Sequence, residues 1–376
     1  MSPSPPPIQI AIIGAGIAGV TLALALTEKN PALQLTIFES RLRFSEISAG
    51  VGFGPNAFLD QLVAQLSEKV TVKFGKRVID VIEDEDNATE KIRMRFEDGE
   101  EAYADAVIGC DGIRSACRRI LLGENDASAH AVYSGKYAYR KVVDMKKAIK
   151  AVGEDVRDRQ MFVGPKGHIL THPIRNGKAL SVVAFRDAEG VPWKQRQWVI
   201  PSTREAILRD FHGWDDKIVK ILQLIEDPEK WALFDTLPIR TFNSPSTRFC
   251  ILGDAAHAAT PHLDAGAGFA IEDVHLLSTL LSPDLIHTAS DISWALWAWE
   301  EARWPRCDEL TRRSRNQGRL LALQGDGGAM VTEEEVGKRV EESMRWVWEG
   351  DLEGMVGEGR ILFCKRREET SYLSVF

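Results

Sequence analysis

The sequence is poor in cysteine, and its cysteines form no recognisable pair. There are five, scattered along 376 residues, with no CxxC motif and an odd total. This usage is typical of free thiols in a reducing compartment and disfavours a disulfide framework. The N-terminal MSPSPPP has neither a basic n-region nor a cleavage-site pattern. We therefore expect no secretory signal and a cytoplasmic protein.

An excess of positive charge is also missing. The formal net charge is −8, so a surface for nucleic acid or anionic membranes is not expected. The hydrophobic fraction of 44% and the charged fraction of 27% are ordinary for a globular protein. A chain of this length can form two or three domains or one large interleaved fold. We expect a small or medium-sized ligand as partner, and the sequence indicates no oligomeric state.

One apolar run approaches the length of a membrane span. Residues 8–26 read IQIAIIGAGIAGVTLALAL, but three glycines interrupt the run and argue against a span. Ile8–Ile13 is instead typical of a buried parallel strand, Val20–Lys29 of a helix and Leu35–Phe38 of a second strand. Together these segments predict a β-α-β unit.

The turn of this unit carries a GxGxxG motif. Gly14 permits the tight turn, Gly16 lets the backbone approach a pyrophosphate, and Gly19 allows the helix to pack closely on the strand. Glu39 follows the second strand, where a carboxylate can accept hydrogen bonds from ribose hydroxyls. The pattern predicts a dinucleotide site without deciding between NAD and FAD.

A second glycine-rich segment, LGDAAHAATPHLDAGAGFAIED, covers residues 252–273. It follows an apolar strand at Phe249–Leu252, so Asp254 lies at a strand's carboxyl end, where ligands bind in α/β sheets. A new helix opens at Gly266–Phe269, and its exposed amides suit a phosphate or the polar edge of a ring. His257 and His262 flank the loop, but the glycine turn explains the segment and we predict no metal site.

With a third motif, CDGIRS at 110–115, the sequence resembles the group A aromatic-ring flavoprotein monooxygenases of the salicylate hydroxylase type over nearly its whole length. The resemblance implies an α/β fold in which a Rossmann-like, GR2-type FAD-binding domain is interleaved with a mixed β-sheet substrate domain, followed by C-terminal helices. The implied boundaries are 1–125 and 246–325 for the two parts of the FAD-binding domain, 126–245 for the substrate domain and 326–376 for a helical tail.

The resemblance also implies the chemistry. NAD(P)H reduces bound FAD, dioxygen adds to flavin C4a, and the hydroperoxide hydroxylates a phenolic or hydroxybenzoate-like ring. The setting would be aromatic catabolism or the tailoring of a polyketide-type metabolite. Two alternatives stay open: an uncoupled flavin-dependent NAD(P)H oxidase or dehydrogenase, and a truncated, non-catalytic nucleotide-binding relative.

Residues that match the family's motifs would contact the dinucleotide end of FAD. Gly14, Gly16, Gly19 and Glu39 would hold the ADP moiety, and Asp254 would bind the ribityl or pyrophosphate region.

Other matching residues would lie against the flavin ring. Gly52, in SAGVGFG, would pass backbone against the flavin, and Pro261 would lie near its reactive face. Amides for the isoalloxazine would come from Gly266, Ala267 and Gly268. The turn at Asp111 would be shared between flavin and nicotinamide contacts.

Two catalytic candidates come from the middle of the chain. Arg140 matches a position where relatives use arginine to stabilise a phenolate or carboxylate. His172 matches a position that is commonly tyrosine, but imidazole can also bond or deprotonate a phenol. From the residues alone, Arg140 could instead form a rim salt bridge and His172 could be a satisfied strand histidine. His168 faces the same side, and we expect it to be structural. Asp264 departs from a glycine that is frequent in relatives.

Several other segments have local signals. Alternating polarity predicts antiparallel strands at 70–74, 77–83 and 91–97, and a further mixed sheet from 136–143, 167–174 and 179–185. Beyond residue 270 we expect mostly helix.

Three local predictions concern helices. Ser202 and Glu205 are spaced as a capping box. Pro305 should kink or break its helix. Helically spaced tryptophans favour packing of the C-terminal helices onto the core; they are Trp294, Trp297 and Trp304.

The joint in residues 50–66, GVGFGPNAFLDQLVAQL, is abrupt. In the family that the sequence resembles, further helix, strands and a His-Arg-Ala-type stretch stand between the glycine-rich loop and the next helix, and that arginine helps to hold FAD. The resemblance therefore implies an internal deletion after Ala57. We expect weaker FAD retention, a more open active site and more peroxide leakage than is usual in the family.

Overall fold

The computed structural model describes residues 6–44, 57–83, 91–244, 246–325 and 329–373. Gly52 and the joint at residues 50–56 lie outside the described residues. The chain divides into two compact units. The first comprises Met1–Ala131, Thr236–Arg312 and Glu349–Phe376, and the second comprises Val132–Asp235 and Arg313–Trp348. The expected helical tail, 326–376, is thus divided between the units.

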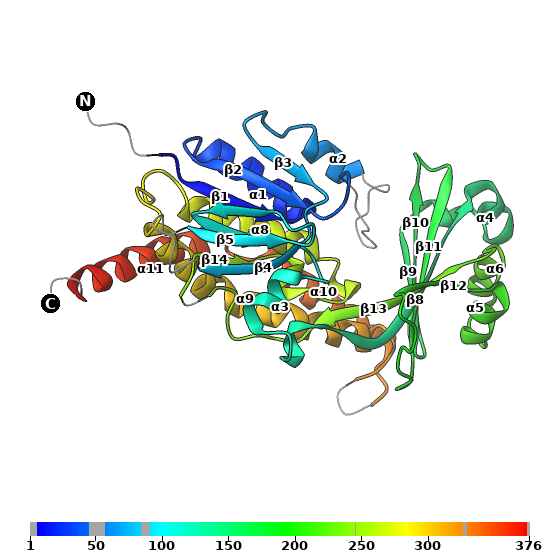
Figure 1. The fold of residues 1–376 in the computed structure, drawn as a ribbon. Coiled ribbons are helices and arrows are strands. Elements are labelled where there is room, and N and C mark those ends of the chain that lie inside the picture. Colours follow the sequence, from blue (N-terminus) through cyan, green and yellow to red (C-terminus); the bar gives the residue numbers. More distant parts are fainter. Residues whose placement is uncertain (1–5, 45–56, 84–90, 245, 326–328, 374–376) are drawn as a thin grey trace. The chain divides into compact units, whose positions relative to one another are not determined.

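A parallel sheet forms the centre of the first unit (Figure 1). Its strand order is β14 (Phe249–Ile251), β7 (Ala106–Gly109), β1 (Gln9–Ile13), β2 (Gln34–Glu39) and β3 (Thr71–Phe74). Strands β1 and β2 pair in parallel, and α1 (Ile17–Lys29) connects them along the chain, as the β-α-β prediction requires. Strand β1 pairs on both edges, and its apolar run is buried, as is typical of a central strand in a parallel sheet whose two faces are covered.

The antiparallel prediction for residues 70–74 is wrong. Strand β3 pairs in parallel with β2, with Thr71 opposite Thr36. The sequence of β3 alternates in polarity because β3 is an edge strand of the sheet and every second side chain is exposed. The neighbouring prediction is confirmed, because β4 (Val78–Glu83) and β5 (Ile92–Phe96) are antiparallel. A strand that the sequence did not indicate, β6 (Glu101–Ala104), completes this smaller sheet.

Helices supply the rest of the first unit. They are α2 (Ala57–Val63), α3 (Ala116–Leu122), α7 (Asp254–His257), α8 (Gly266–Leu280), α9 (Asp291–Leu320) and α11 (Leu352–Leu373). Residues of α9 up to Arg312 belong to this unit, and those from Arg313 belong to the second. Of the two outcomes expected at Pro305, the break is wrong, because α9 continues through it, and a kink stays a prediction. No described helix is both long and apolar enough to cross a membrane.

Two of the three tryptophans pack between the C-terminal helices α9 and α11. Trp294 packs edge-on against Phe363 of α11, with ring centroids 6.2 Å apart. Arg366, also of α11, lies 5.1 Å from the ring centre of Trp297. These contacts fasten α11 onto α9 within the first unit.

The second unit is built on a six-stranded sheet (Figure 1). Its strand order is β12 (Val199–Pro201), β13 (Glu229–Thr236), β8 (Ala131–Asp144), β11 (Ala179–Asp187), β10 (Gly167–Ile174) and β9 (Gln160–Gly164). Its helices are α4 (Met145–Val152), α5 (Arg204–Asp210), α6 (Asp216–Gln223) and α10 (Glu333–Trp348). The strands predicted at 136–143, 167–174 and 179–185 all form part of this sheet.

One face of this sheet is covered by α4, α5 and α6 (Figure 1). The core between them contains strand residues such as Tyr139, Ile169 and Leu180. The cap of α5 differs from the prediction, because Thr203 rather than Ser202 accepts the hydrogen bond from the Ala206 amide.

Candidate functional site

The three glycines of the first motif have different roles in the structure. Gly14 has a φ of +103°, and a Cβ there would lie 2.5 Å from the carbonyl oxygen of Cys110. A Cβ on Gly19 would lie 2.0 Å from the carbonyl oxygen of Gly14. A Cβ on Gly16 would meet no atom within 4 Å. Gly14 and Gly19 are therefore required by the fold, whereas Gly16 borders open space that a ligand can enter.

Glu39 lies beside this loop at the carboxyl end of β2. Its Oε2 accepts a hydrogen bond from the Ala15 amide at 2.8 Å, and its Oε1 accepts one from the Arg41 amide at 2.8 Å. The two amides hold the carboxylate at the end of the strand. The carboxylate thus lies at the strand end where the ribose contact is expected from the sequence.

Helices α1 and α8 begin without a side-chain cap. The N-cap residues are Gly16 and Ala265, and the first turns contain no acidic residue. Helices α3, α4, α5 and α6 have side-chain caps, from Ser115, Asp144, Thr203 and Asp215 respectively. Uncapped helix N-termini present free amides and a positive dipole end. The two glycine motifs thus offer donors that suit phosphate or carbonyl oxygens.

The segment before α8 brings Asp254 close to these amides. Asp254 is the first residue of α7, its side chain is exposed, and its Oδ1 would lie 3.8 Å from a Cβ on Gly266. A Cβ on Gly268 would meet no atom within 4 Å. Pro261 begins a single 3-10 turn that ends at Asp264, whose φ is +51°. This left-handed conformation explains why glycine suits the position, and aspartate tolerates it better than most residues.

Asp111 has a structural task that the sequence did not reveal. Its carboxylate accepts hydrogen bonds from the Ser115 hydroxyl and from the amides of Ala116 and Cys117, the latter two at 2.7 and 3.0 Å. These bonds fasten the first turn of α3 to the end of the preceding strand. Because the carboxylate is occupied in this way, we expect a cofactor contact from this turn to come from its backbone.

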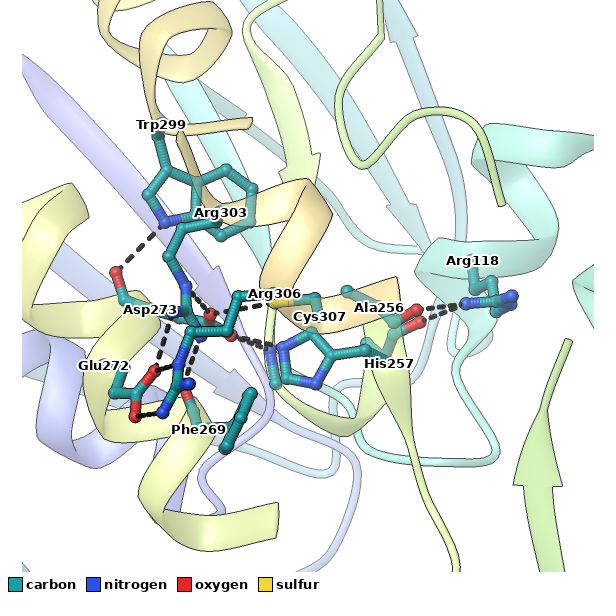
Figure 2. Close-up of polar contacts among 12 residues, drawn as sticks. Arg118, Ala256, His257, Phe269, Glu272, Asp273, Trp299, Arg303, Arg306 and Cys307 are labelled. Carbon is teal, nitrogen blue, oxygen red and sulfur yellow. Dashed lines mark hydrogen bonds and ion pairs between the residues drawn. The ribbon is translucent and has the colours of Figure 1, made fainter. Parts of the chain in front are cut away.

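Arg118 is a buried residue that sequence reasoning missed. It is 1% exposed and donates to four carbonyl oxygens, of which Figure 2 shows that of Ala256. These oxygens belong to Ser128, Leu237, Ala255 and Ala256. Burial lowers the pKa of Arg118 to about 10, so it stays charged at neutral pH. Arg118 therefore joins α3, which follows the Asp111 turn, to α7, which carries Asp254.

We expect Arg118→Met to destabilise the protein strongly. The substitution keeps an unbranched side chain but leaves buried carbonyls without a donor, which should lower the free energy of unfolding by about 3 kcal/mol. Chemical denaturation measures this loss. The matched control is Arg119→Met on the same helix, where the loss should be about 1 kcal/mol or less. Equal losses for the two variants would contradict the role assigned to Arg118.

Side chains of α7, α8 and α9 form a buried ionic cluster (Figure 2). Asp273 accepts from Arg303 Nε at 2.8 Å on one oxygen, and its other oxygen lies 2.6 Å from His257 Nε2. His257, Asp273 and Cys307 offer potential metal-ligand atoms within 4.8 Å of one another. Both oxygens of Asp273 are already bonded, however, so the arrangement is that of an ion-pair network. The sequence segment 252–273 contains both His257 and Asp273, but Arg303 comes from the later helix α9, which only the fold brings near.

Both catalytic candidates lie on one face of the sheet of the second unit. Arg140 pairs with Val183 of β11, and His172 pairs with Ser181 of the same strand. Since Val183 and Ser181 are two residues apart, their side chains and those of their partners face the same way. This face is opposite to the one covered by α4, α5 and α6. The sheet register therefore brings together two residues from separate strands.

Arg140 forms a contact other than a salt bridge. Its guanidinium lies 4.9 Å from the ring centre of Trp231. Within the described part of the chain, no ion pair of Arg140 is found, and the rim salt bridge considered above is not formed there. Burial lowers the pKa of Arg140, against the opposing charge of Glu229, but the group remains charged at neutral pH.

His172 is held in its neutral form. Burial lowers its pKa, and the positive charges of Arg159 and Arg140 lower it further. His168 differs, because it is 2% exposed and stacks on Phe185 with ring centroids 4.4 Å apart. This supports the structural role expected for His168. The sheet face can therefore attract an anion through Arg140 and accept a proton through His172.

A parallel sheet with a ligand-accessible glycine loop, a fixed carboxylate at Glu39 and a second uncapped helix is the architecture of a dinucleotide-binding α/β protein. The family described as FAD binding domain matches residues 56–314. The chain belongs to this family and is an FAD-dependent monooxygenase.

Curated relatives match most of the chain. The chain is 32% identical to 6-methylsalicylate 1-monooxygenase of Aspergillus terreus, covering 97% of this chain and 94% of the relative. It is 32% identical to a salicylate hydroxylase of Pseudomonas putida, covering 94% and 95%. It is 33% identical to a dual trans-enoyl reductase/FAD-dependent monooxygenase of Aspergillus terreus, but spans only 61% of that longer protein.

A solved structure has the same architecture. A salicylate hydroxylase in complex with substrate superposes with a TM-score of 0.81 at 28% identity, covering 94% of this chain and 98% of the other. The alignment with the 6-methylsalicylate 1-monooxygenase extends over 430 residues, although this chain has 376. Relatives therefore have residues at positions where this chain has none.

Proposed function

We propose that this protein uses FAD, NAD(P)H and dioxygen to hydroxylate a small phenolic or hydroxybenzoate-like ring. The observation that carries the proposal is the placement of Arg140 and His172 on one face of the second unit's sheet. The names of the relatives, salicylate hydroxylase and 6-methylsalicylate 1-monooxygenase, support a substrate of this class. Its four buried and one exposed free cysteines suit a reducing compartment such as the cytoplasm.

The residues of the first unit fit FAD. Glu39 would accept from the adenosine ribose, and the amides at the start of α1 would face the pyrophosphate. Asp254 and the amides of Gly266, Ala267 and Gly268 would hold the ribityl chain and the ring. Gly52 and Pro261 complete the set that we assign to the flavin. When bound, FAD supplies electron transfer from NAD(P)H and the activation of dioxygen.

The second unit would bind and activate the substrate. The Arg140 guanidinium would hold a phenolate or carboxylate oxygen of the ring compound, because it is a charged donor without a carboxylate partner among the described residues. His172, neutral at neutral pH, would accept the phenolic proton. A phenolate is the more electron-rich ring, so this proton transfer prepares the substrate for oxygen transfer.

A partly uncoupled enzyme is the second candidate. It rests on the family alignment that is longer than this chain and on the abrupt joint in the sequence at Ala57. If the missing residues follow Ala57, one wall of the substrate site is reduced, and water reaches the activated oxygen more easily.

We expect this protein to release more peroxide per NAD(P)H consumed than a full-length relative. The ratio of hydroxylated product to hydrogen peroxide, measured under identical conditions with the Pseudomonas putida salicylate hydroxylase as reference, tests this. Slowly exchanging FAD with fully coupled hydroxylation would contradict the proposed deletion.

An absorbance spectrum followed by a screen of phenols tests the proposed function. Purified or FAD-reconstituted protein should show a flavin spectrum, and phenols that carry an ortho carboxylate should stimulate NAD(P)H oxidation. Failure to take up FAD on reconstitution would refute the proposal.

A further inference from the structure

One buried carboxylate holds both ends of the helix that carries Asp254. Asp273 Oδ2 accepts a hydrogen bond from the Gly253 amide at 2.9 Å, directly before α7. The same oxygen lies 2.6 Å from Nε2 of His257, the last residue of α7. Arg118 holds the intervening carbonyls from the other side (Figure 2). This leaves Asp254, the exposed residue of α7, as the side chain that points outward.

The same carboxylate is tied to the first turns of α8. Asp273 lies on α8, and its other oxygen accepts from Arg303 Nε at 2.8 Å. Arg303 also donates to the Phe269 carbonyl at 3.3 Å and to Glu272 at 2.7 Å. Arg306 makes two further bonds to Glu272. The network therefore fixes α7, the start of α8 and the middle of α9 relative to one another.

The charges in this network support a fixed geometry. Asp273 and Arg303 are both fully buried. Burial alone would raise the pKa of Asp273, but the charges of His257 and Arg303 hold it far below its usual range. Burial alone would lower the pKa of His257, but the charge of Asp273 raises it well above the ordinary value. Asp273 is therefore ionised at neutral pH. Moving it away from its partners would leave a buried charge unpaired, which is strongly unfavourable.

We propose that Asp273 is a positioning residue of the cofactor site. It sets the spacing between Asp254 and the amides that begin α8, the two groups that would hold the ribityl chain and the flavin ring. This inference rests on the proposed function, because these groups need a fixed spacing only if one cofactor spans both. Asp273 would thereby act on the affinity of FAD, on its electronic environment and on the coupling of oxygen transfer, without touching the cofactor.

Asp273→Asn is the direct test, with Glu272→Gln as the matched control. Both substitutions remove a charge from α8 and weaken a contact to Arg303, but only Asp273 bonds α7. For Asp273→Asn we expect FAD to bind at least tenfold more weakly, with altered absorbance bands and a shifted reduction potential of the bound flavin. For Glu272→Gln the thermal stability should fall, while FAD affinity, spectrum and potential stay at wild-type values.

His257 provides a second test if Asp273→Asn does not fold. His257→Leu removes the bond to the end of α7 and keeps the pair of Asp273 with Arg303. FAD binding should weaken and the flavin bands should shift, and His257→Gln, which restores a donor, should recover part of both. Wild-type affinity, spectrum and potential in Asp273→Asn, or in His257→Leu where only that variant folds, would overturn the positioning role. Wild-type protein that takes up no FAD would instead refute the proposed function.

Discussion

Gly16→Asp should abolish FAD binding while leaving the apoprotein at least as stable as the wild type. Gly16 is the N-cap of α1, in extended backbone, and a Cβ there meets no atom within 4 Å. An aspartate at this position can cap the helix, which relative to glycine stabilises a protein by about a few tenths of a kcal/mol. The same carboxylate would occupy the space assigned to the pyrophosphate and repel it. We expect the dissociation constant for FAD to rise at least about 1,000-fold, equivalent to about 4 kcal/mol.

A titration of apoprotein with FAD, together with thermal unfolding of the apoprotein, measures both effects. Gly14→Ala is the contrasting variant, because its backbone has a φ of +103° and its new Cβ would lie 2.5 Å from a carbonyl oxygen. That variant should lose apoprotein stability as well as FAD binding. If Gly16→Asp bound FAD normally, the pyrophosphate would not lie against Gly16.

Arg140→Met should lower kcat/KM for an anionic phenol by about 100- to 1,000-fold, or about 3–4 kcal/mol of transition-state stabilisation. The reason is the loss of a charged donor on the substrate face of the second unit. Lys141→Met is the matched control, since the neighbouring side chain faces the opposite side of β8. Steady-state kinetics of both variants with saturating FAD measure the difference. Equal losses of kcat/KM in the two variants would contradict the role of Arg140 in binding the substrate anion.

The same variant has a consequence for pH dependence. His172 must be neutral to accept a proton, so activity should fall as the pH drops through its pKa. Burial and the charges of Arg159 and Arg140 lower that pKa, so the acid limb of kcat/KM should lie below about pH 6.5, the ordinary value for histidine. Removing the Arg140 charge should raise the pKa and move the limb to higher pH. If the acid limb of Arg140→Met lies at the same pH as that of the wild type, His172 is not the group that accepts the proton.

Local patterns predicted much of the fold. The strand at 167–174 has the predicted limits, and α8 begins at Gly266 as the glycine-rich turn indicated. These signals depend on neighbouring residues, which a sequence displays directly. The pairing of β3 depends instead on where the chain returns to the sheet, and alternation alone could not distinguish a parallel edge strand from an antiparallel one. Continuation of α9 through Pro305 likewise depends on surrounding packing.

The candidate site could be predicted where glycines and strand ends mark it. Gly14, Gly16 and Glu39 are recognisable because the chemistry of the turn requires those residue types at that spacing. Arg118 and Asp273 were missed because their partners are backbone groups and side chains that only the tertiary fold brings near. The common face of Arg140 and His172 was also hidden, because it depends on the register of β11 between their strands.

The most direct test of the central claim follows labelled oxygen during turnover. The protein, reconstituted with FAD and supplied with NAD(P)H and an ortho-hydroxybenzoate, is allowed to react under isotopically labelled dioxygen. We expect a hydroxylated ring that carries one labelled oxygen atom from the gas, alongside some labelled peroxide. Oxidation of NAD(P)H that yields labelled peroxide alone, with every tested phenol recovered unchanged, would contradict the central claim.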